Sequence, residues 1–456
     1  MLPPRMAKAD LTDKHLSELH ATAAELGVPG YRMLRRERLI EEIEARGEQA
    51  DGAETAEVES GEPAAEQEPA PIEAEEVAVE EEGDEVAVEE EGEEVEERAA
   101  RPSEKPPDVA TEQVSGVLDV TYRGYGFLRL RGLESSPGDV YISASQIRRC
   151  ELRLGDLVSG PARQPERDER YPALVHVDLV NGAALGEQTD RPDLDALTPV
   201  PPRRRLGLEP DEADILTRAV DLLVPLALGQ RVLIRAAPRS GRTTLLRGLT
   251  GAIQRSPDRP ALVVLLVDER PEEATAWAEV LPDDELAVAT AEMSPREQAR
   301  VADLALERAK RRAEGGEDVV LIVDSLSRLA VAKREPGDVK HVFGAGRELA
   351  EEGSGSLTVI ATVLDGVADE GAALSAVETT ENVLVRLDPE LAAAGAFPAL
   401  DVGETRASGE EDLREPDELD AVRRLRAELA GKDPAEAAAL LRERLEGSRS
   451  NAELLT

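Results

Sequence analysis

A short stretch near the middle of the chain has the residue types of a phosphate-binding loop. An apolar run over 232–234 leads into small residues and then into Ser240-Gly241-Arg242-Thr243-Thr244, after which an apolar helical pattern begins. In such a loop, successive backbone N–H groups and a helix N-terminus point at an anion, and small residues let phosphates approach the backbone. The stretch therefore has the means to bind a phosphorylated ligand.

The loop departs from the G-x-x-x-x-G-K-[ST] pattern at two positions. Ala236 stands at the first Gly and Arg242 stands at the Lys, whereas Thr243, the residue type that would bind Mg²⁺, is present. Taken alone, the loop is therefore equally well interpreted as an ordinary β-α turn.

Two carboxylates downstream of the loop strengthen the nucleotide interpretation. The runs 261–267 and 319–323 are short and unbroken in their apolar character, which is typical of strands buried on both faces of a parallel sheet. The first run is followed by Asp268-Glu269 and the second by Asp324. Open α/β sheets bind ligands at the carboxyl ends of their strands. We therefore expect Asp324 to hold Mg²⁺ through water and Glu269 to orient an attacking water, although each carboxylate alone is more often a turn or helix-cap residue.

A second stretch, G-Y-G-F-L-R at 124–129, has the residue types of a surface that stacks nucleic-acid bases. Tyr125 and Phe127 alternate, so they share one face of a strand, and the flanking glycines leave room for a base to lie on the rings. Only 2% of the chain is aromatic, which favours a binding role over core packing for this pair.

The elements that must position these residues form several predicted domains. Apolar runs that alternate with helical patterns, such as 295–313, predict an α/β P-loop domain over residues 206–456. Five strand-like segments separated by short turns predict an OB-like β-barrel over 111–183. A Pro-rich connector, 184–205, joins the two, and residues 10–47 read as a small helical domain with a basic second half.

Longer motifs carry a family resemblance. V-x-L-L-V-D-E-R-P-E-E-A-T at 263–275, D-S-L-S-R-L-A at 324–330 and F-G-A-G-R at 343–347 resemble the ATPase core of the bacterial Rho transcription termination factors. G-Y-G-F-L-R and D-V-Y-I-S at 139–143 resemble the family's cold-shock-like RNA-binding domain, and 10–47 resembles its N-terminal domain. The resemblance implies a RecA-like ATPase that uses ATP and Mg²⁺, moves along pyrimidine-rich single-stranded RNA and releases transcripts. Its partners would be RNA polymerase with the transcription complex and further subunits, in a homohexamer or in a ring mixed with a second Rho.

The resemblance also assigns residues. Glu269 would be catalytic with Arg406 as the arginine finger, and Thr243 and Asp324 would hold the metal. The nucleotide-binding residues would be Ala227, Leu228, Gly229, Gln230, Arg231, Val232, Arg239, Ser240, Gly241, Arg242, Thr243, Thr244 and Arg270. The RNA-binding residues would be Gly124, Tyr125, Gly126, Phe127, Leu128, Arg129, Asp139, Val140, Tyr141, Glu169, Arg170 and Tyr171. Asp139 and Glu169 have the acceptors that the exocyclic amine of cytosine requires.

Several departures from the family pattern fall in the predicted ATPase domain. Arg242 replaces a Lys, only 331–342 stands where the family has a long Gly-rich RNA-gripping loop, and 366–380 contains no Lys or Arg. An apparent small deletion precedes Arg406 relative to the family pattern, so Arg406 matches the family's arginine finger only loosely. Two hypotheses stay open: a working Rho motor, and a Rho-like RNA-binding ring component whose ATP hydrolysis is slow and barely dependent on RNA.

The net charge and the sequence composition limit the possible modes of nucleic-acid binding and the expected location of the protein. The formal net charge is −42, and residues 51–100 contain 22 acidic residues against one basic residue. Bulk attraction for nucleic acid is therefore excluded, and an RNA site must be local. The chain has one cysteine, no stretch resembling a signal peptide and no run of membrane-spanning length. We expect a cytoplasmic protein without a membrane partner.

Deleting the acidic segment 48–110 should leave the melting temperature of the rest of the chain unchanged. The segment repeats E-V-A-V-E-E-E-G at 76–83 and 85–92, and such a composition cannot offset the entropy of ordering. Calorimetry of the full chain and the deletion variant makes the comparison. A shifted melting temperature, or strong amide protection within the segment, would show that it is ordered.

Overall fold

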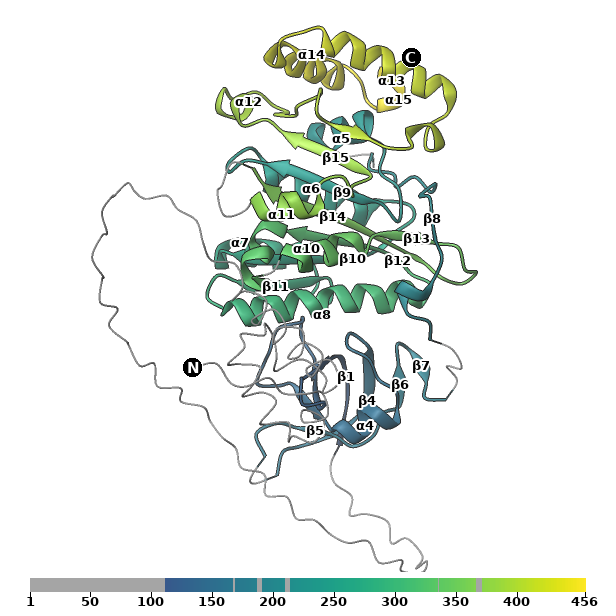
Figure 1. Cartoon of the computed structure of the whole chain (residues 1–456), viewed down its shortest axis with the longest axis vertical. Helices are drawn as coiled ribbons and strands as arrows, with labels where there is room; N and C mark the ends of the chain where they lie inside the picture. Colours follow the sequence, from purple (N-terminus) through teal and green to yellow (C-terminus); the bar gives the residue numbers. More distant parts are fainter. Residues whose placement is uncertain (1–110, 167–168, 187–190, 210–213, 335, 366–370) are drawn as a thin grey trace, which may run out of the picture. The chain divides into compact units, whose positions relative to one another are not determined.

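The structure is a computed structural model that describes residues 111–456 except 167–168, 187–190, 210–213, 335 and 366–370 (Figure 1). The predicted helical domain 10–47 and the acidic segment 48–110 lie outside the described residues. Among the described residues, no helix has both the length and the apolar character needed to cross a bilayer.

The first described domain is a small closed barrel, which confirms the predicted OB-like fold. It contains β1 (Thr111–Val120), β2 (Gly126–Arg129), β3 (Val140–Ile142), α4 (Ala144–Arg149), β4 (Leu157–Arg163), β5 (Ala173–Leu174), β6 (Leu179–Val180) and β7 (Ala183–Ala184). The strand order β1-β2-β3-β5-β4 closes because β1 also pairs with β4. Alternate residues of β1 and β2, such as Leu118 and Leu128, are fully buried in the barrel core.

The second domain is built on a mainly parallel sheet, which confirms the predicted α/β P-loop fold. Its strands are β9 (Arg231–Ala236), β10 (Ala261–Glu269), β11 (Leu286–Thr290), β12 (Asp318–Asp324), β14 (Ser356–Leu364) and β15 (Val383–Leu387), in the order β11-β10-β12-β14-β9-β15. Shorter antiparallel strands complete it: β8 (Pro199–Val200), β13 (Arg347–Leu349) and β16 (Arg406–Ala407). The parallel register brings the carboxyl ends of β9, β10 and β12 to one edge of the sheet.

Helices cover both faces of this sheet (Figure 1). One hydrophobic core joins the sheet to α5 (Ile215–Leu223), α6 (Arg242–Arg255), α13 (Pro416–Ala430), α14 (Pro434–Glu446) and α15 (Asn451–Leu455). The other core joins it to α8 (Pro295–Glu314), α9 (Leu326–Lys333), α10 (Pro336–Gly344) and α11 (Gly371–Val377). Two short helices, α7 (Pro271–Ala278) and α12 (Pro389–Ala393), follow β10 and β15.

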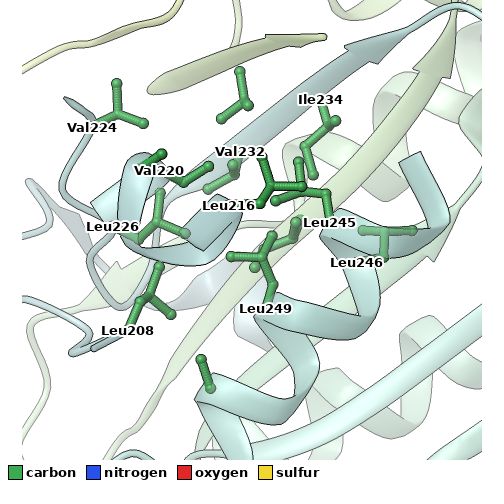
Figure 2. Close-up of a cluster of buried hydrophobic side chains, with 14 of the residues drawn as sticks. Leu208, Leu216, Val220, Val224, Leu226, Val232, Ile234, Leu245, Leu246 and Leu249 are labelled. Carbon is green, nitrogen blue, oxygen red and sulfur yellow. The ribbon is translucent and has the colours of Figure 1, made fainter. Parts of the chain in front are cut away.

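The core on the α6 face fixes the helix that begins at the phosphate loop. Figure 2 shows Leu245, Leu246 and Leu249 of α6 directed toward Val232 and Ile234 of β9 and toward side chains of α5. All three leucines of α6 are fully buried. Because burying such a side chain stabilises the fold by roughly 1.5–3 kcal/mol, the start of α6 is held firmly against the end of β9.

Gly229, just before β9, should tolerate no side chain. Its φ is +83°, and an added Cβ would lie 2.4 Å from the backbone nitrogen of Glu348. Gly229→Ala combines left-handed strain with a backbone clash, so it should lower the free energy of unfolding by about 3 kcal/mol. Urea denaturation of the full chain measures this loss.

Gly182→Ala is the matched control, because Gly182 also has a φ of +83° but an added Cβ would meet nothing within 4 Å. It should cost about 1 kcal/mol through backbone strain alone. Equal losses in the two variants would contradict the predicted clash at Gly229.

Candidate nucleotide site and candidate RNA-binding face

The predicted phosphate loop has the strand–loop–helix geometry that anion binding requires. β9 ends at Ala236, and α6 begins at Arg242 after the N-cap residue Gly241, whose φ of 96° is left-handed. The backbone N–H and the hydroxyl of Ser240 both donate to the Ala237 carbonyl, which closes the turn. The first N–H groups of α6 lack partners within the helix, so this end of α6 is a favourable place for an anion.

Arg242 does not point freely from the loop toward solvent. Its Nε lies 3.2 Å from Oδ1 of Asp324, and its Nη2 lies 3.5 Å from Oε1 of Glu269. Only 11% of its side chain is exposed. The other oxygen of Glu269, Oε2, accepts a 2.5 Å hydrogen bond from Nη1 of Arg328, on α9. We refer to Arg242, Arg328, Asp324 and Glu269 as the four-charge cluster.

The formal charges of the four-charge cluster cancel, since two guanidiniums face two carboxylates. Asp324 is almost fully buried, and Oγ1 of Thr362 donates to its Oδ1 at 2.8 Å. Burial raises the pKa of the Asp324 carboxyl, and the adjacent Arg242 opposes that rise. A carboxylate in this position requires a cationic partner, and Arg242 supplies it.

The arrangement does not fit the predicted Mg²⁺ site. Thr243 lies in the first turn of α6, as expected, but the guanidinium of Arg242 already lies against both carboxylates that a cation would use. Within the described residues, no group of three or more His, Cys, Asp or Glu side chains could hold a metal ion. Arg242 therefore supplies at these carboxylates the positive charge that the sequence pattern assigns to a metal.

Residues 227–232, predicted to bind nucleotide, lie at the other end of β9 from the loop. The strand runs from Arg231 to Ala236, so about five residue steps of roughly 3.3 Å separate the two ends. Arg231 donates there to the carbonyls of Thr380 and Gly346, and Gln230 accepts from the Ala227 N–H. The strand that links the two groups holds them apart, so residues 227–232 do not contribute to the phosphate loop itself, and their contact with another part of the nucleotide stays a prediction.

The other predicted arginines are accessible. Arg270 is an exposed residue directly before α7. Arg406, on β16, is 59% exposed, and its Nη2 lies 3.4 Å from Glu381. Because Arg406 pairs with Leu384, whereas Leu387 pairs with the last residue of β9, Arg406 lies toward the end of the sheet away from the phosphate loop. This position does not support a role for Arg406 as an arginine finger at the phosphate loop of the same subunit.

The segment between the two helices after Asp324 is short, as the sequence indicates. α9 ends at Lys333, and Arg334, with a φ of 59°, turns the chain toward α10. Within 331–342, where the family has a long loop, residues 331–333 belong to α9 and residues 336–342 belong to α10. In the segment without Lys or Arg, 366–380, residues 371–377 form α11, and residues 366–370 lie outside the described residues.

On the barrel, four aromatic rings form one cluster, which we call the aromatic face. The ring of Phe127 lies 5.9 Å from that of Tyr125, 6.1 Å from that of Tyr141 and 5.0 Å from that of Tyr171, between centroids. The guanidinium of Arg170 lies 5.5 Å from the centre of the Tyr171 ring. The sequence predicted all of these residues, and the structure brings them together.

A cavity of about 300 Å³ opens on the aromatic face. Tyr125, Phe127 and Tyr171 line it from the barrel. Arg129 also lines it, and the lining includes residues that were not predicted from the sequence, among them Tyr122, Arg296 and Arg300. Tyr122 precedes the Gly-rich stretch and could have been noticed there, but the two arginines belong to α8, and no local pattern links them to the barrel.

Four residues predicted to contact RNA are buried. Arg129 is 7% exposed and donates to Asp119 and Asp139, and Asp139 also accepts the Ser136 N–H at 2.8 Å. Leu128 and Val140 belong to the barrel core. Alternation places the side chains of Leu128 and Val140 inside the barrel, whereas Arg129 also lines the cavity on the aromatic face, so its contact with RNA stays a prediction.

Glu169, in contrast, stays exposed. Nη1 and Nη2 of Arg163 donate to its two carboxylate oxygens at 2.6 and 2.5 Å, and this bond lowers the pKa of the carboxyl. An ionised, accessible acceptor thus lies one residue before the Arg170–Tyr171 pair of the aromatic face.

Comparisons with known proteins agree with this description. Residues 114–185 match the family Rho termination factor, RNA-binding domain, and residues 10–52 match Rho termination factor, N-terminal domain. Residues 217–345 match ATP synthase alpha/beta family, nucleotide-binding domain. A solved type III secretion ATPase, EscN from enteropathogenic E. coli, overlaps 60% of this chain and 78% of its own at a TM-score of 0.46 and 23% identity, which carries no further argument.

The curated relatives are more similar. Transcription termination factor Rho of Mycobacterium tuberculosis is 36% identical over 76% of this chain and 61% of the relative. The proteins of that name from Aquifex aeolicus and Bacillus subtilis are 37% and 38% identical, over 75% and 68% of this chain and 84% and 76% of their own lengths. The chain spans about three fifths of the length of the mycobacterial relatives. It belongs to the Rho family of transcription termination factors.

Proposed function

We propose that this protein acts in transcription termination by binding single-stranded RNA at the aromatic face and a nucleotide at the phosphate loop. The observation that carries the proposal is the cluster of Tyr125, Tyr141 and Tyr171 around Phe127. Every base has a π-face, and stacking on such rings contributes about 1–3 kcal/mol per base. The transcription complex with RNA polymerase would be the partner through which bound RNA acts.

A preference for cytosine follows from the acceptor at the edge of the site. A cavity of about 300 Å³ has room for a base among the rings. Glu169, exposed and ionised, provides an acceptor for the exocyclic amine of cytosine. Asp139 does not share that task, because it is only 1% exposed and its carboxylate is bonded to Arg129 and Ser136 inside the barrel.

ATP is the proposed ligand of the phosphate loop. The start of α6 offers N–H groups to the phosphates, and Arg239 to Thr244 frame them. Glu269 would orient the attacking water, but it accepts hydrogen bonds from Arg328 and lies against Arg242. Because its two carboxylate oxygens are engaged with these guanidiniums, the geometry supports nucleotide binding better than rapid hydrolysis.

Subunits would assemble into a ring, as a homohexamer or together with a second Rho. The position of Arg406 supports assembly, because the residue is exposed and lies toward the end of the sheet away from its own phosphate loop. In a ring it would serve the nucleotide of a neighbouring subunit.

The comparisons favour the full activity, in which ATP hydrolysis drives translocation along RNA and release of transcripts. The four-charge cluster and the short turn at Arg334 favour a second candidate function, a regulatory RNA-binding ring component with little hydrolysis. Phosphoryl transfer depends on positioning and charge stabilisation, and here the charges are engaged with one another.

Replacing both Tyr125 and Phe127 with Ala should weaken binding of oligo(C) to the full chain by roughly 2–4 kcal/mol, if two stacked bases are lost. Fluorescence anisotropy with a labelled oligonucleotide measures the affinity. Phe397→Ala, which removes an exposed aromatic ring outside the barrel, is the control and should bind as the original chain does. Equal affinity of the double variant and the original chain would remove the RNA-binding proposal.

Arg129→Ala should act on stability. Removing this guanidinium leaves Asp119 and Asp139 buried with fewer partners, so the free energy of unfolding should fall by about 3 kcal/mol. Arg123→Ala removes an exposed arginine of the same domain and should change it by less than about 0.5 kcal/mol. Urea denaturation compares the variants, and an Arg129→Ala protein as stable as the Arg123→Ala protein would contradict the internal role.

A further inference from the structure

The four-charge cluster is complete without a cation. Glu269 and Asp324 together carry two negative charges, and the guanidiniums of Arg242 and Arg328 carry two positive ones. Glu269 and Asp324 are 6% and 1% exposed, so solvent and salt screen the cluster weakly. A divalent ion brought to these carboxylates would add two positive charges to a neutral group and would meet the guanidinium of Arg242 at close range.

Arg242 also occupies the bridging position. Its Nε and Nη2 lie within 3.5 Å of one oxygen from each carboxylate, so a single planar group joins the ends of β10 and β12. A lysine ammonium is a compact point charge with three donors, whereas the guanidinium is a rigid fork that can engage two partners at once. The substitution of Arg for Lys therefore changes what else can bind there.

One nitrogen of Arg242 stays available. Nη1 is buried and has no hydrogen-bond partner among the residues that the structure describes. Arg242 is also the first residue of α6, so its guanidinium and the free N–H groups of the helix start belong to one site. A negatively charged acceptor, such as a phosphate oxygen, can accept hydrogen bonds from Nη1 and from these N–H groups.

We propose that the phosphate loop of this chain binds the nucleotide without a divalent cation, with Arg242 providing the positive charge at the phosphates. The inference rests on the nucleotide binding proposed above. It assigns Arg242 two tasks at once, since Nε and Nη2 hold the carboxylates while Nη1 faces the phosphates.

Titrating the full chain with a fluorescent ATP analogue, once in EDTA and once in Mg²⁺, tests the proposal. The affinity of the original chain should agree within about twofold in the two conditions. Arg242→Lys should bind about tenfold more tightly in Mg²⁺ than in EDTA, because an ammonium can neutralise one carboxylate and leaves the other for a cation.

Arg247→Lys is the matched control. Arg247 lies on the same helix, is 42% exposed and pairs with Glu273 outside the cluster. This variant should be insensitive to Mg²⁺, like the original chain. Should Arg242→Lys fail to fold, judged by urea denaturation of the full chain, Arg242→Gln replaces it and should likewise bind more tightly with the cation.

Two results overturn the inference. Binding of nucleotide by the original chain only in Mg²⁺ would show that Arg242 leaves the carboxylates when nucleotide enters, and the proposed nucleotide binding would then stand without the inference. Absence of binding in both conditions would remove the inference together with the nucleotide half of the proposed function.

Discussion

The contact of Arg242 with Asp324 and Glu269 is the constraint on which the rest of the nucleotide site depends. Two carboxylates lie almost fully buried at neighbouring strand ends, and each would be costly there without a cationic partner. The sheet register fixes Asp324 and Glu269, and the leucines of α6 fix the backbone from which Arg242 extends. Because all three positions are set by packing, the side chains have little freedom to arrange themselves differently.

In the barrel, buried carboxylates are likewise paired with an arginine. Arg129 lies beneath the aromatic face and joins Asp119 to Asp139, while Nε of Arg300 on α8 reaches Asp119 at 2.8 Å. In both candidate sites an arginine that a sequence pattern assigns to the ligand is directed at the protein's own acidic groups. In an acidic chain, this internal pairing reduces the positive charge that remains for RNA or phosphate, so stacking carries a larger share of RNA binding.

The sequence was informative where local pattern decides structure. Apolar runs located β10 and β12, the Gly-rich stretch located the start of α6, and alternation placed Tyr125 and Phe127 on one face. It was uninformative where partners are distant in sequence. Arg242 and Asp324 are 82 positions apart, and no periodicity shows that their side chains meet. Residues 227–232 show the same limit, since a motif that is continuous in sequence spans the whole length of a strand.

RNA-stimulated phosphate release by the pure, full-length protein tests the account most directly, measured with ATP in the absence and presence of poly(C). With Glu269 held between two guanidiniums and no long loop between α9 and α10, hydrolysis should be slow and should change by less than about twofold when poly(C) is added. A rise of about tenfold or more with poly(C) would show that the four-charge cluster opens during turnover, and it would contradict the account in favour of a working Rho motor.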